Sequence, residues 1–474
     1  MRVAGRLFGL VVSGALMLGT GQGEVRTDTP SRAAREPAPF TLPLRVPEVL
    51  DPVERTRSQD RYRVVMRTAE AEILPGERTP VWGYQGSYPG PTIVARRGRR
   101  VVVTHINRLP DPTSVHLHGG KVRAASDGHP LDLIAPGSRY RYRYPNRQRP
   151  ATYWYHDHAD RMTGRHVYMG LAGFYLVRDP AERSLGLPRG RYDVPLVVQD
   201  RTFNDDGSLW FPEGETQQVV GDTVVVNGVA QPFFEVKARK YRFRLLNGAN
   251  STPFEFALAN GDPLIQIATD AGLMPNPVAR ESVLLFPAER ADVVIDFSGY
   301  EVGTSVVLRN LAGSGTTSEV MRFDVVGEAE DRSRVPSTLR RLPPLHPPDR
   351  TRSFRLSFDS ARELWTFNGA AFDPKRIDAR PRIGETEVWR FVNESGLAHP
   401  IHLHEVSFQI LDRNGRQPPP WEVGLKDTVV VHPGETVRIS ITFRGYPGTY
   451  VFHCHNLQHE DHGMMAQFEL RPRR

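Results

Sequence analysis

The stretch GRRVVVTHIN at 98–107 sets the pattern for most of this 474-residue chain. Apolar and polar side chains alternate along it, and it lies between a glycine and an asparagine, as is typical of a half-buried β-strand bounded by turns. Two related stretches follow, ARKYRFRLLN at 238–247 and GETEVWRFVN at 384–393. The sequence therefore predicts three copies of one structural unit.

The spacing beyond each copy extends the repeat. Nine residues after the closing asparagine, the first and third copies have HLH, at 116–118 and 402–404. At the same distance the middle copy has FAL, at 256–258. A Pro-Gly pair begins twenty residues before His156 and again twenty residues before His453. We interpret the middle copy as a unit that keeps the scaffold and lacks the histidines.

The predicted fold is all-β. Short alternating runs separated by many turn residues (41 Gly and 40 Pro) favour β-sandwiches of antiparallel strands with Greek-key connections. We expect three such domains at 41–182, 190–328 and 352–474, with a Pro- and charge-rich linker at 329–351.

The first residues resemble a targeting segment. Arg2 and Arg6 precede a short apolar run that small residues follow. This pattern predicts a secretory signal peptide at 1–23, with a polar, extended segment at 24–40. We therefore expect a secreted or extracytoplasmic protein. The apolar run is too short for stable membrane insertion.

The charge pattern argues against a nucleic-acid partner. The net charge is +7, but the arginines are scattered among Asp and Glu, as on a solvated surface. We expect a monomer that acts on small molecules.

Histidines gather in four clusters: HLHG at 116–119, WYHDH at 154–158, HPIHLH at 399–404 and HCHNLQHEDHGM at 453–464. Because residues i and i+2 of a strand face the same side, each His-x-His offers two imidazoles together. Two pairs come from the first unit and two from the third. If these units pack face to face, eight imidazoles converge. Imidazole suits both copper and zinc, and eight rings exceed the needs of one tetrahedral zinc, so the pattern predicts several metal ions, for which three sites fit.

The single cysteine, Cys454, lies between two of these histidines and faces the opposite side of the strand. His459 follows it by five residues and Met464 by ten, and His399, three residues before His402, need not share that residue's direction. Two histidines, a cysteine and a weak axial methionine form the blue-copper arrangement. Met465 is the alternative axial ligand. The sequence therefore predicts a second metal site, joined to the first by a few covalent bonds.

Isolated His-x-His pairs and lone buried cysteines are usually incidental, so the prediction depends on the complete set. We interpret six further histidines without this spacing as structural or surface residues: His105, His129, His166, His346, His432 and His462.

These four motifs resemble, in order and spacing, those of the multicopper oxidases, over about residues 40–474. The finer likeness is to three-domain bacterial laccases of the spore-coat type and to bilirubin oxidases, and it depends on YHDHA, RKYRFRLLN, HPIHLHEVSF and HCHNLQHED. The resemblance implies cupredoxin-like domains and four copper ions. It also implies a laccase-like oxidase that couples one-electron oxidation of phenolic or aromatic substrates to reduction of O2 to water.

The resemblance also implies ligand roles. The type 1 copper would be held by His399, Cys454 and His459 with Met464 axial, the type 2 copper by His116 and His402, and the type 3 pair by His118, His156, His158, His404, His453 and His455. Cys454 would pass electrons to the other three coppers.

Three acidic residues receive roles by the same resemblance. Asp127 and Glu460 would assist O2 reduction as acids, although Glu460 and Asp461 could instead be exposed charges. Asp427, in GLKDT, would orient a type 1 histidine, which we expect to be His399.

Proteins with other functions also have part of this motif pattern. A cuprous oxidase for copper tolerance has the same motifs, but such enzymes often carry a methionine-rich insert that this chain, with nine Met, lacks. Bilirubin oxidation is a further alternative. A non-catalytic cupredoxin-type protein usually lacks copper ligands, whereas all twelve positions are filled here.

Overall fold

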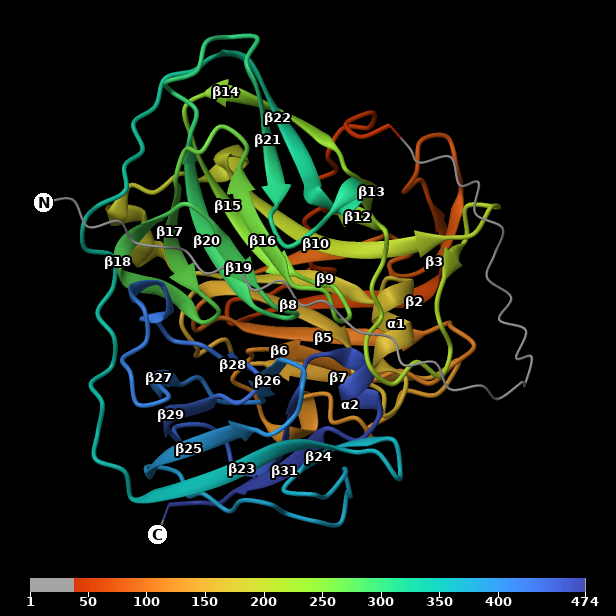
Figure 1. Cartoon of the computed structure of the whole chain (residues 1–474), viewed down its shortest axis with the longest axis vertical. Coiled ribbons are helices and arrows are strands. Elements are labelled where there is room, and N and C mark those ends of the chain that lie inside the picture. The colour runs from red at the N-terminus through yellow and green to blue at the C-terminus, as the bar shows by residue number, and fades with distance from the viewer. Residues whose placement is uncertain (1–37, 474) are drawn as a thin grey trace, which may run out of the picture. The chain divides into compact units, whose positions relative to one another are not determined.

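The computed structural model describes residues 38–473, and its elements are mostly β-strands (Figure 1). The all-β prediction is therefore confirmed. The predicted signal peptide at 1–23 and most of the segment at 24–40 lie outside the described residues. The part of the chain that the structure describes contains no helix long and apolar enough to cross a membrane.

The strands form six sheets, two in each of the three predicted ranges. In the first range, one sheet contains β1 (Glu54–Arg55), β2 (Gln59–Ala71), β3 (Thr79–Tyr84), β5 (Arg100–Asn107) and β7 (Arg139–Tyr144), and the other contains β4 (Gly90–Arg96), β6 (Val115–His118), β8 (Ala151–Asp157) and β9 (Ala172–Arg178).

In the second range, the larger sheet contains β10 (Asp193–Phe203), β11 (Leu209–Trp210), β12 (Thr223–Val226), β13 (Val229–Ala230), β15 (Lys240–Asn247), β17 (Leu264–Thr269), β18 (Gly272–Arg280) and β20 (Arg290–Asp296). The smaller contains β14 (Phe233–Ala238), β16 (Phe254–Leu258), β19 (Val283–Leu285), β21 (Ser305–Asn310) and β22 (Glu319–Glu328).

In the third range, one sheet contains β23 (Arg350–Asp359), β24 (Leu364–Phe367), β25 (Thr386–Asn393), β27 (Gln409–Arg413) and β29 (Thr436–Thr442), and the other contains β26 (His399–Leu403), β28 (Thr428–Val431), β30 (Gly448–Cys454) and β31 (Met465–Leu470). The helices are short: α1 (Thr163–Met169), α2 (Leu457–Asp461), and 3-10 turns at Ala124–Ser126, Pro180–Leu185, Gly190–Tyr192, Gly315–Ser318 and Pro420–Glu422.

The sheets are mixed, which corrects the expectation of purely antiparallel strands. The repeated strand (β5, β15 or β25) pairs in parallel with β2, β10 or β23. On its other edge it pairs antiparallel with β7, β20 or β29. A parallel pair needs a long crossover, and here each crossover passes through strands of the partner sheet or a long loop. The same neighbours in all three units confirm the repeat.

The asparagine that ends each repeated strand makes the same set of hydrogen bonds. The Asn107 amide donates to the carbonyls of Asp111 and Ile134, both at 2.8 Å, and its oxygen accepts from the backbone N–H of Leu109 at 2.9 Å. Asn393 repeats these bonds with Leu397, Val431 and Ser395. One side chain thus ties the turn after each strand to a neighbouring strand, and this explains its place in the motif.

Asn247 repeats the pattern with one difference, which corrects the predicted alignment of the middle copy. Its amide donates to Leu285 and to Thr252, five residues ahead, whereas Asn107 and Asn393 reach only four residues ahead. The middle loop is therefore one residue longer, and the strand that follows it, β16, is displaced by one.

Strand pairing fixes the corrected register. Phe254 pairs with Leu285 as His399 pairs with Val431. The equivalents of His402 and His404 are therefore Ala257 and Ala259, not Phe256 and Leu258. A one-residue shift exchanges the two faces of a strand, so Phe256 and Leu258 point into the sandwich instead.

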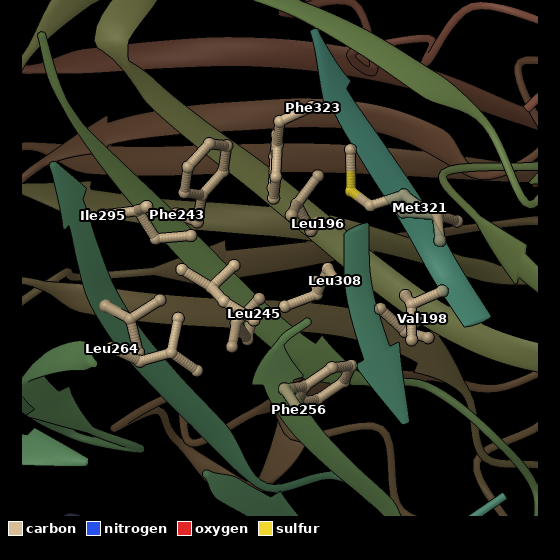
Figure 2. Close-up of a cluster of buried hydrophobic side chains, with 14 of the residues drawn as sticks. Leu196, Val198, Phe243, Leu245, Phe256, Leu264, Ile295, Leu308, Met321 and Phe323 are labelled. Carbon is tan, nitrogen blue, oxygen red and sulfur yellow. The ribbon is translucent and has the colours of Figure 1, made fainter. Parts of the chain in front are cut away.

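The hydrophobic core of the middle unit lies between its two sheets (Figure 2). Phe243, Phe256, Leu264, Leu308 and Phe323 belong to this cluster. The first and third units have their own buried cores. Residues 329–349 contain no helix or strand, yet Leu339 is buried and its N–H donates to Pro275, so the predicted linker packs along the middle unit.

Candidate copper centres

Two pairs of antiparallel strands position the four His-x-His motifs. In the first unit His116 of β6 lies directly opposite His156 of β8. In the third unit His402 of β26 lies directly opposite His453 of β30. Side chains at directly opposed positions share a face, so each strand pair presents four imidazoles on one side. All eight rings are buried.

The eight imidazoles meet where the first and third units contact each other, and their nitrogens form three groups. Nε2 of His116 lies 3.4 Å from Nε2 of His402. Nε2 of His453 lies 3.2 Å from the Nε2 atoms of both His158 and His404. The third group contains the rings of His118, His156 and His455, whose centroids are 5.1–5.7 Å apart.

Hydrogen bonds at the other ring nitrogen orient most of these imidazoles. Nδ1 of His116 donates to the carbonyl of Asp127 at 2.6 Å, and Nδ1 of His402 donates to that of Asp427 at 2.8 Å. Nδ1 of His156 donates to the carbonyl of Asp157 at 2.8 Å. A proton on Nδ1 leaves Nε2 with a free lone pair.

The remaining ring nitrogens indicate whether metal ions fit among the eight histidines. Nδ1 of His118, Nε2 of His156 and both nitrogens of His455 are buried without a hydrogen-bond partner. Nitrogen lone pairs also face each other at 3.2–3.4 Å in the other two groups. A buried polar atom without a partner is costly, and facing lone pairs repel unless a cation lies between them. The residues therefore fit a cluster of several metal ions.

A second site lies on the opposite face of β30. Sγ of Cys454 is 3.5 Å from Nδ1 of His399 and 3.5 Å from Nδ1 of His459, and these two nitrogens are 3.1 Å apart. All three side chains are buried. A thiolate with two imidazoles is a soft donor set that suits copper.

The pairing of β30 and β31 separates the two methionines. Met465 lies opposite His453, so it shares the face of the histidine cluster. Met464 therefore faces the side of Cys454, and both residues belong to the buried core of the third unit. The N–H of Cys454 donates to the carbonyl of Met464 at 3.0 Å. The geometry favours Met464 as the axial neighbour.

Burial keeps these imidazoles neutral, which is the form that binds metals. It lowers the pKa of His399 and His156 to about 3 and that of His158 to about 4. Burial also raises the pKa of the Cys454 thiol, so a thiolate there needs a cation beside it.

Two of the predicted acids contact the histidine cluster. Oδ2 of Asp127 accepts from Nδ1 of His404 at 2.7 Å, and burial raises the pKa of this carboxyl. Glu460 lies 2.9 Å from Nδ1 of His453 and 3.5 Å from Nδ1 of His158. Burial opposes its charge, whereas the interactions with His453 and His158 lower its pKa.

Glu460 is only 2% exposed, so the alternative of an exposed charge is wrong for this residue. The neighbouring Asp461 has a different role. Its carboxylate accepts from the backbone N–H groups of Thr163 and Gly164, at 3.1 and 2.8 Å. Asp461 therefore caps helix α1 of the first unit and helps to hold the first and third units together.

The expected role of Asp427 is wrong in one respect. Its carboxylate lies 3.2 Å from Nε2 of His118, in the histidine cluster, and not beside His399. Instead, Nε2 of His399 contacts Oγ of Ser395 at 2.6 Å. Asp427 directly precedes β28, whose first residue, Thr428, pairs with His402 of β26.

Sequence reasoning missed several side chains around both sites. Trp154 stacks on His156 with ring centroids 4.2 Å apart, and Trp365 lies 3.9 Å from the ring of His459. Trp154 directly precedes the motif at 155–158, which could have marked it. Trp365 and Ser395 lie in segments whose position depends on the tertiary fold, so no local signal identifies them.

Known proteins share this sequence and fold. Two family profiles described as multicopper oxidase match residues 65–182 and 345–474. A laccase of Bacillus stratosphericus is 38% identical, covering 91% of this chain and 99% of the relative. A bilirubin oxidase of Albifimbria verrucaria is 40% identical, covering 90% of this chain and 81% of the relative. The structure resembles the crystal structure of a laccase from Pediococcus acidilactici, with a TM-score of 0.86, 35% identity, and coverage of 92% and 95%.

These similarities and the site geometry agree. The chain belongs to the multicopper oxidase family. It is a laccase-like oxidoreductase that uses O2, and its cofactors are four copper ions: one type 1, one type 2 and a type 3 pair.

Proposed function

We propose that the protein oxidises small phenolic or aromatic reductants at the site of Cys454 and reduces O2 to water at the histidine cluster. The observation that carries this proposal is the geometry of β30, which places Cys454 in one site and His453 and His455 in the other. Copper supplies one-electron redox chemistry that couples these two half-reactions.

The three nitrogen groups suggest how the chain would hold its coppers. His399, Cys454 and His459, with Met464 axial, would hold the type 1 ion. His116 and His402 would hold the type 2 ion. The other six histidines would hold the type 3 pair: His118, His156 and His455 on one side, and His158, His404 and His453 on the other.

The backbone of β30 provides the route between the two sites. His453 and His455 are covalent neighbours of Cys454, and Nδ1 of His453 also donates to the Cys454 carbonyl at 3.0 Å. Electrons therefore have a covalent path and a hydrogen-bonded shortcut of a few bonds each.

Asp127 and Glu460 are suited to manage protons beside the cluster. Each carboxylate contacts the outer nitrogen of a cluster histidine, and each is buried away from bulk water. Oδ1 of Asp127 has no hydrogen-bond partner, so it is an atom that can carry a proton.

A segment of the middle unit covers the site of Cys454 and restricts the reductant. Between β11 and β12, the carbonyl of Thr216 accepts from the Trp365 indole at 2.9 Å, and the carbonyl of Gln217 accepts from the Asn456 amide at 3.1 Å. Both His399 and His459 are fully buried. We infer that small donors approach through the half-buried Ser395 beside His399, and that bulky donors react slowly.

Oxygen uptake by the copper-loaded protein tests this function. We expect small phenols to support turnover with a higher kcat/KM than bilirubin or Cu(I). Faster turnover with Cu(I) than with any phenol would instead identify a cuprous oxidase. If no donor supports oxygen uptake by protein containing four coppers, the proposed oxidase function is wrong.

We further propose that the protein is exported and acts outside the cytoplasm. The support is the sequence pattern at 1–23, where two arginines precede an apolar run. Cell fractionation with N-terminal sequencing of the native protein tests this. Export predicts a mature chain that begins near residue 24, and an intact Met1 in the cytoplasm would contradict it.

A further inference from the structure

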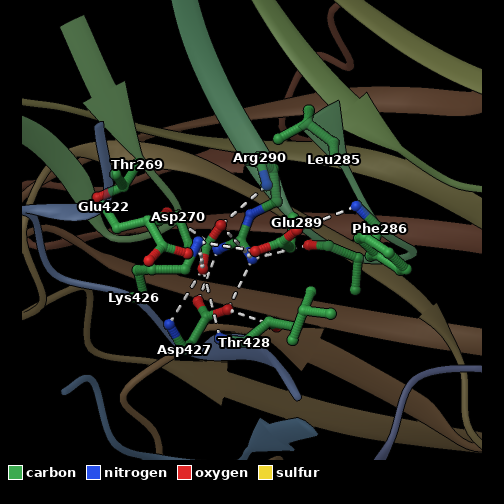
Figure 3. A network of polar contacts seen from close by, with 12 residues as sticks. Thr269, Asp270, Leu285, Phe286, Glu289, Arg290, Glu422, Lys426, Asp427 and Thr428 are labelled. Carbon is green, nitrogen blue, oxygen red and sulfur yellow. Dashed lines mark hydrogen bonds and ion pairs between the residues drawn. The ribbon is translucent and has the colours of Figure 1, made fainter. Parts of the chain in front are cut away.

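A buried arginine of the middle unit, Arg290 at the start of β20, contacts Asp427 beside the histidine cluster (Figure 3). Its side chain is fully buried and forms a two-pronged ion pair with Asp427 of the third unit. Nη1 donates to Oδ1 at 2.7 Å and Nη2 donates to Oδ2 at 2.6 Å. Such a fork fixes both the position and the plane of the carboxylate.

The other donors of Arg290 are also satisfied, and they connect all three units. Nε donates to the carbonyl of Thr152 in the first unit at 3.0 Å. Nη1 and Nη2 donate to the carbonyls of Ala288 and Asp270 in the middle unit, at 3.0 and 2.9 Å. With all five N–H groups engaged, the guanidinium has one orientation, and that orientation aims it at Asp427.

The middle unit holds the segment around Asp427 at further points. Oδ2 of Asp270 accepts from the backbone N–H groups of Asp427 and Thr428, both at 3.3 Å. Lys426 is 3.2 Å from Asp270 and 3.0 Å from Glu289. Residues 426–428 are therefore clamped from one side by residues 270 and 289–290.

The clamped segment in turn contacts two histidines of the cluster. Oδ1 of Asp427 accepts from Nε2 of His118 at 3.2 Å, so Nδ1 of His118 is left free, buried and without a partner. The carbonyl of Asp427 accepts from Nδ1 of His402 at 2.8 Å, which leaves Nε2 free. Asp427 thus selects which nitrogen each of these two ligands presents.

We infer that Arg290 is a positioning residue for the histidine cluster: it acts through Asp427 to set the ligand nitrogens of His118 and His402. The inference rests on the copper assignment proposed above. It gives the middle unit a role in the metal centre although that unit contributes no ligand.

The test compares Arg290→Lys with Arg244→Lys. Arg244 is the matched control, because it is a buried arginine of the middle unit with a two-pronged pair to Asp193, and it also donates to Thr152, at Oγ1. Within the described residues, no hydrogen bond or ion pair joins Arg244 to a histidine or to Asp427. Each variant is purified as the full chain and loaded with copper, and its copper content, blue absorbance and type 2 electron paramagnetic resonance signal are measured.

We expect Arg290→Lys to keep the blue absorbance of the type 1 copper, whose ligands Arg290 does not touch. Its copper content should fall below four per chain, or its type 2 hyperfine splitting should shift, because lysine cannot hold both carboxylate oxygens. Arg244→Lys should match wild type in all three measurements. An unchanged Arg290→Lys, or the same spectral change in both variants, would overturn the inference.

A second variant keeps the test decisive if Arg290→Lys does not fold. Asp427→Asn keeps the side-chain volume but removes one acceptor of the Arg290 fork, and we expect the same type 2 shift with the blue absorbance retained. A wild-type spectrum in Asp427→Asn would contradict the inference. Loss of the type 2 signal from wild type itself would count against the copper assignment and not against Arg290.

Discussion

The third and middle units share one frame, yet of these two only the third has the histidine and cysteine side chains that we assign to copper. At structurally equivalent strand positions, Phe254 replaces His399 and Asn310 replaces Cys454. Alanines replace His402 and His404. The comparison shows that the sandwich does not need its metal sites, because a copy without them folds around the same strand order.

The replacements in the middle unit form ordinary structural contacts. Phe254 and Phe256 belong to its hydrophobic core. Oδ1 of Asn310 accepts from the N–H of Glu255 at 2.9 Å, and its amide donates to the carbonyl of Thr317 at 3.1 Å. In the middle unit, side chains that are buried or hydrogen-bonded thus occupy the positions of the metal ligands. This unit stabilises the two neighbouring units instead of binding metal.

The largest expected effect comes from removing Cys454, the ligand of one site whose covalent neighbours, His453 and His455, belong to the other. Cys454→Ser should abolish the blue colour and reduce substrate oxidation to the level of copper-free protein, because a hydroxyl is a poor ligand for copper. The matched change in the middle unit, Asn310→Ser, should lower stability and keep the blue colour. Absorbance spectra and oxygen uptake measure both. A blue, active Cys454→Ser would show that the type 1 assignment is wrong.

Glu460 and Asp461 are neighbours in the sequence, but we expect a chemical role for Glu460 and a structural role for Asp461. Glu460→Gln should keep the blue colour and slow O2 reduction by roughly 100-fold, since general acid–base groups commonly contribute that much. Asp461→Asn should leave turnover unchanged and cost about 1 kcal/mol of stability through the weakened helix cap. Stopped-flow reoxidation by O2 measures the first effect, and thermal unfolding measures the second. Unchanged reoxidation in Glu460→Gln would remove its proposed acid role.

The repeated asparagines allow the same change in both units. Asn247→Ala removes three hydrogen bonds of a buried side chain and Asn393→Ala removes four, which should cost about 3 to 4 kcal/mol of stability in either unit. Only Asn393→Ala loosens residues 394–398, next to His399, so only this variant should alter the blue absorption band. Identical spectra in the two variants would indicate that the turn does not position His399.

As the pH falls, the histidine-bearing units should lose stability first, because residues 190–328 contain no histidine. Burial lowers the pKa of His105, His156 and His399 to about 3, below the unfolded value of 6.5, so the unfolded chain binds protons first as the pH falls. The contribution of these histidines to the free energy of unfolding of copper-free protein should be constant above pH 6.5. Below that it should fall by about 1.4 kcal/mol per pH unit for each such histidine.

Denaturant unfolding of the copper-free protein at pH 7 and pH 5 measures this slope. Bound copper blocks protonation of His156 and His399 but not of His105, so the copper-loaded protein should lose less stability over the same range. Equal losses with and without copper would mean that the ligand histidines are not the groups that titrate.

Much of this structure could be predicted from the sequence, because its signals are local. Alternation identified the strands, and the i, i+2 spacing placed the paired histidines on one face. The parallel strand pairs could not be predicted, since alternation does not reveal a strand's neighbour. The one-residue insertion after Asn247 also escaped detection, because counting from the asparagine assumes loops of equal length.

The contacts between units were the least predictable. Asp127 and His404 are 277 residues apart, and Asp427 and Arg290 are 137 apart. Asp427 was expected beside His399 from the resemblance of GLKDT to the family, and such a motif does not show which histidine its carboxylate contacts in the folded chain. Arg290 is one arginine among many, and nothing near it in the sequence marks it as buried.

Anomalous diffraction at the copper absorption edge from crystals of the copper-loaded protein tests the central claim most directly. The account predicts one peak enclosed by His399, Cys454 and His459, three peaks among the eight histidines between the first and third units, and none within residues 190–328. A peak inside the middle unit, or a histidine cluster that contains no copper while the Cys454 site is filled, would contradict it.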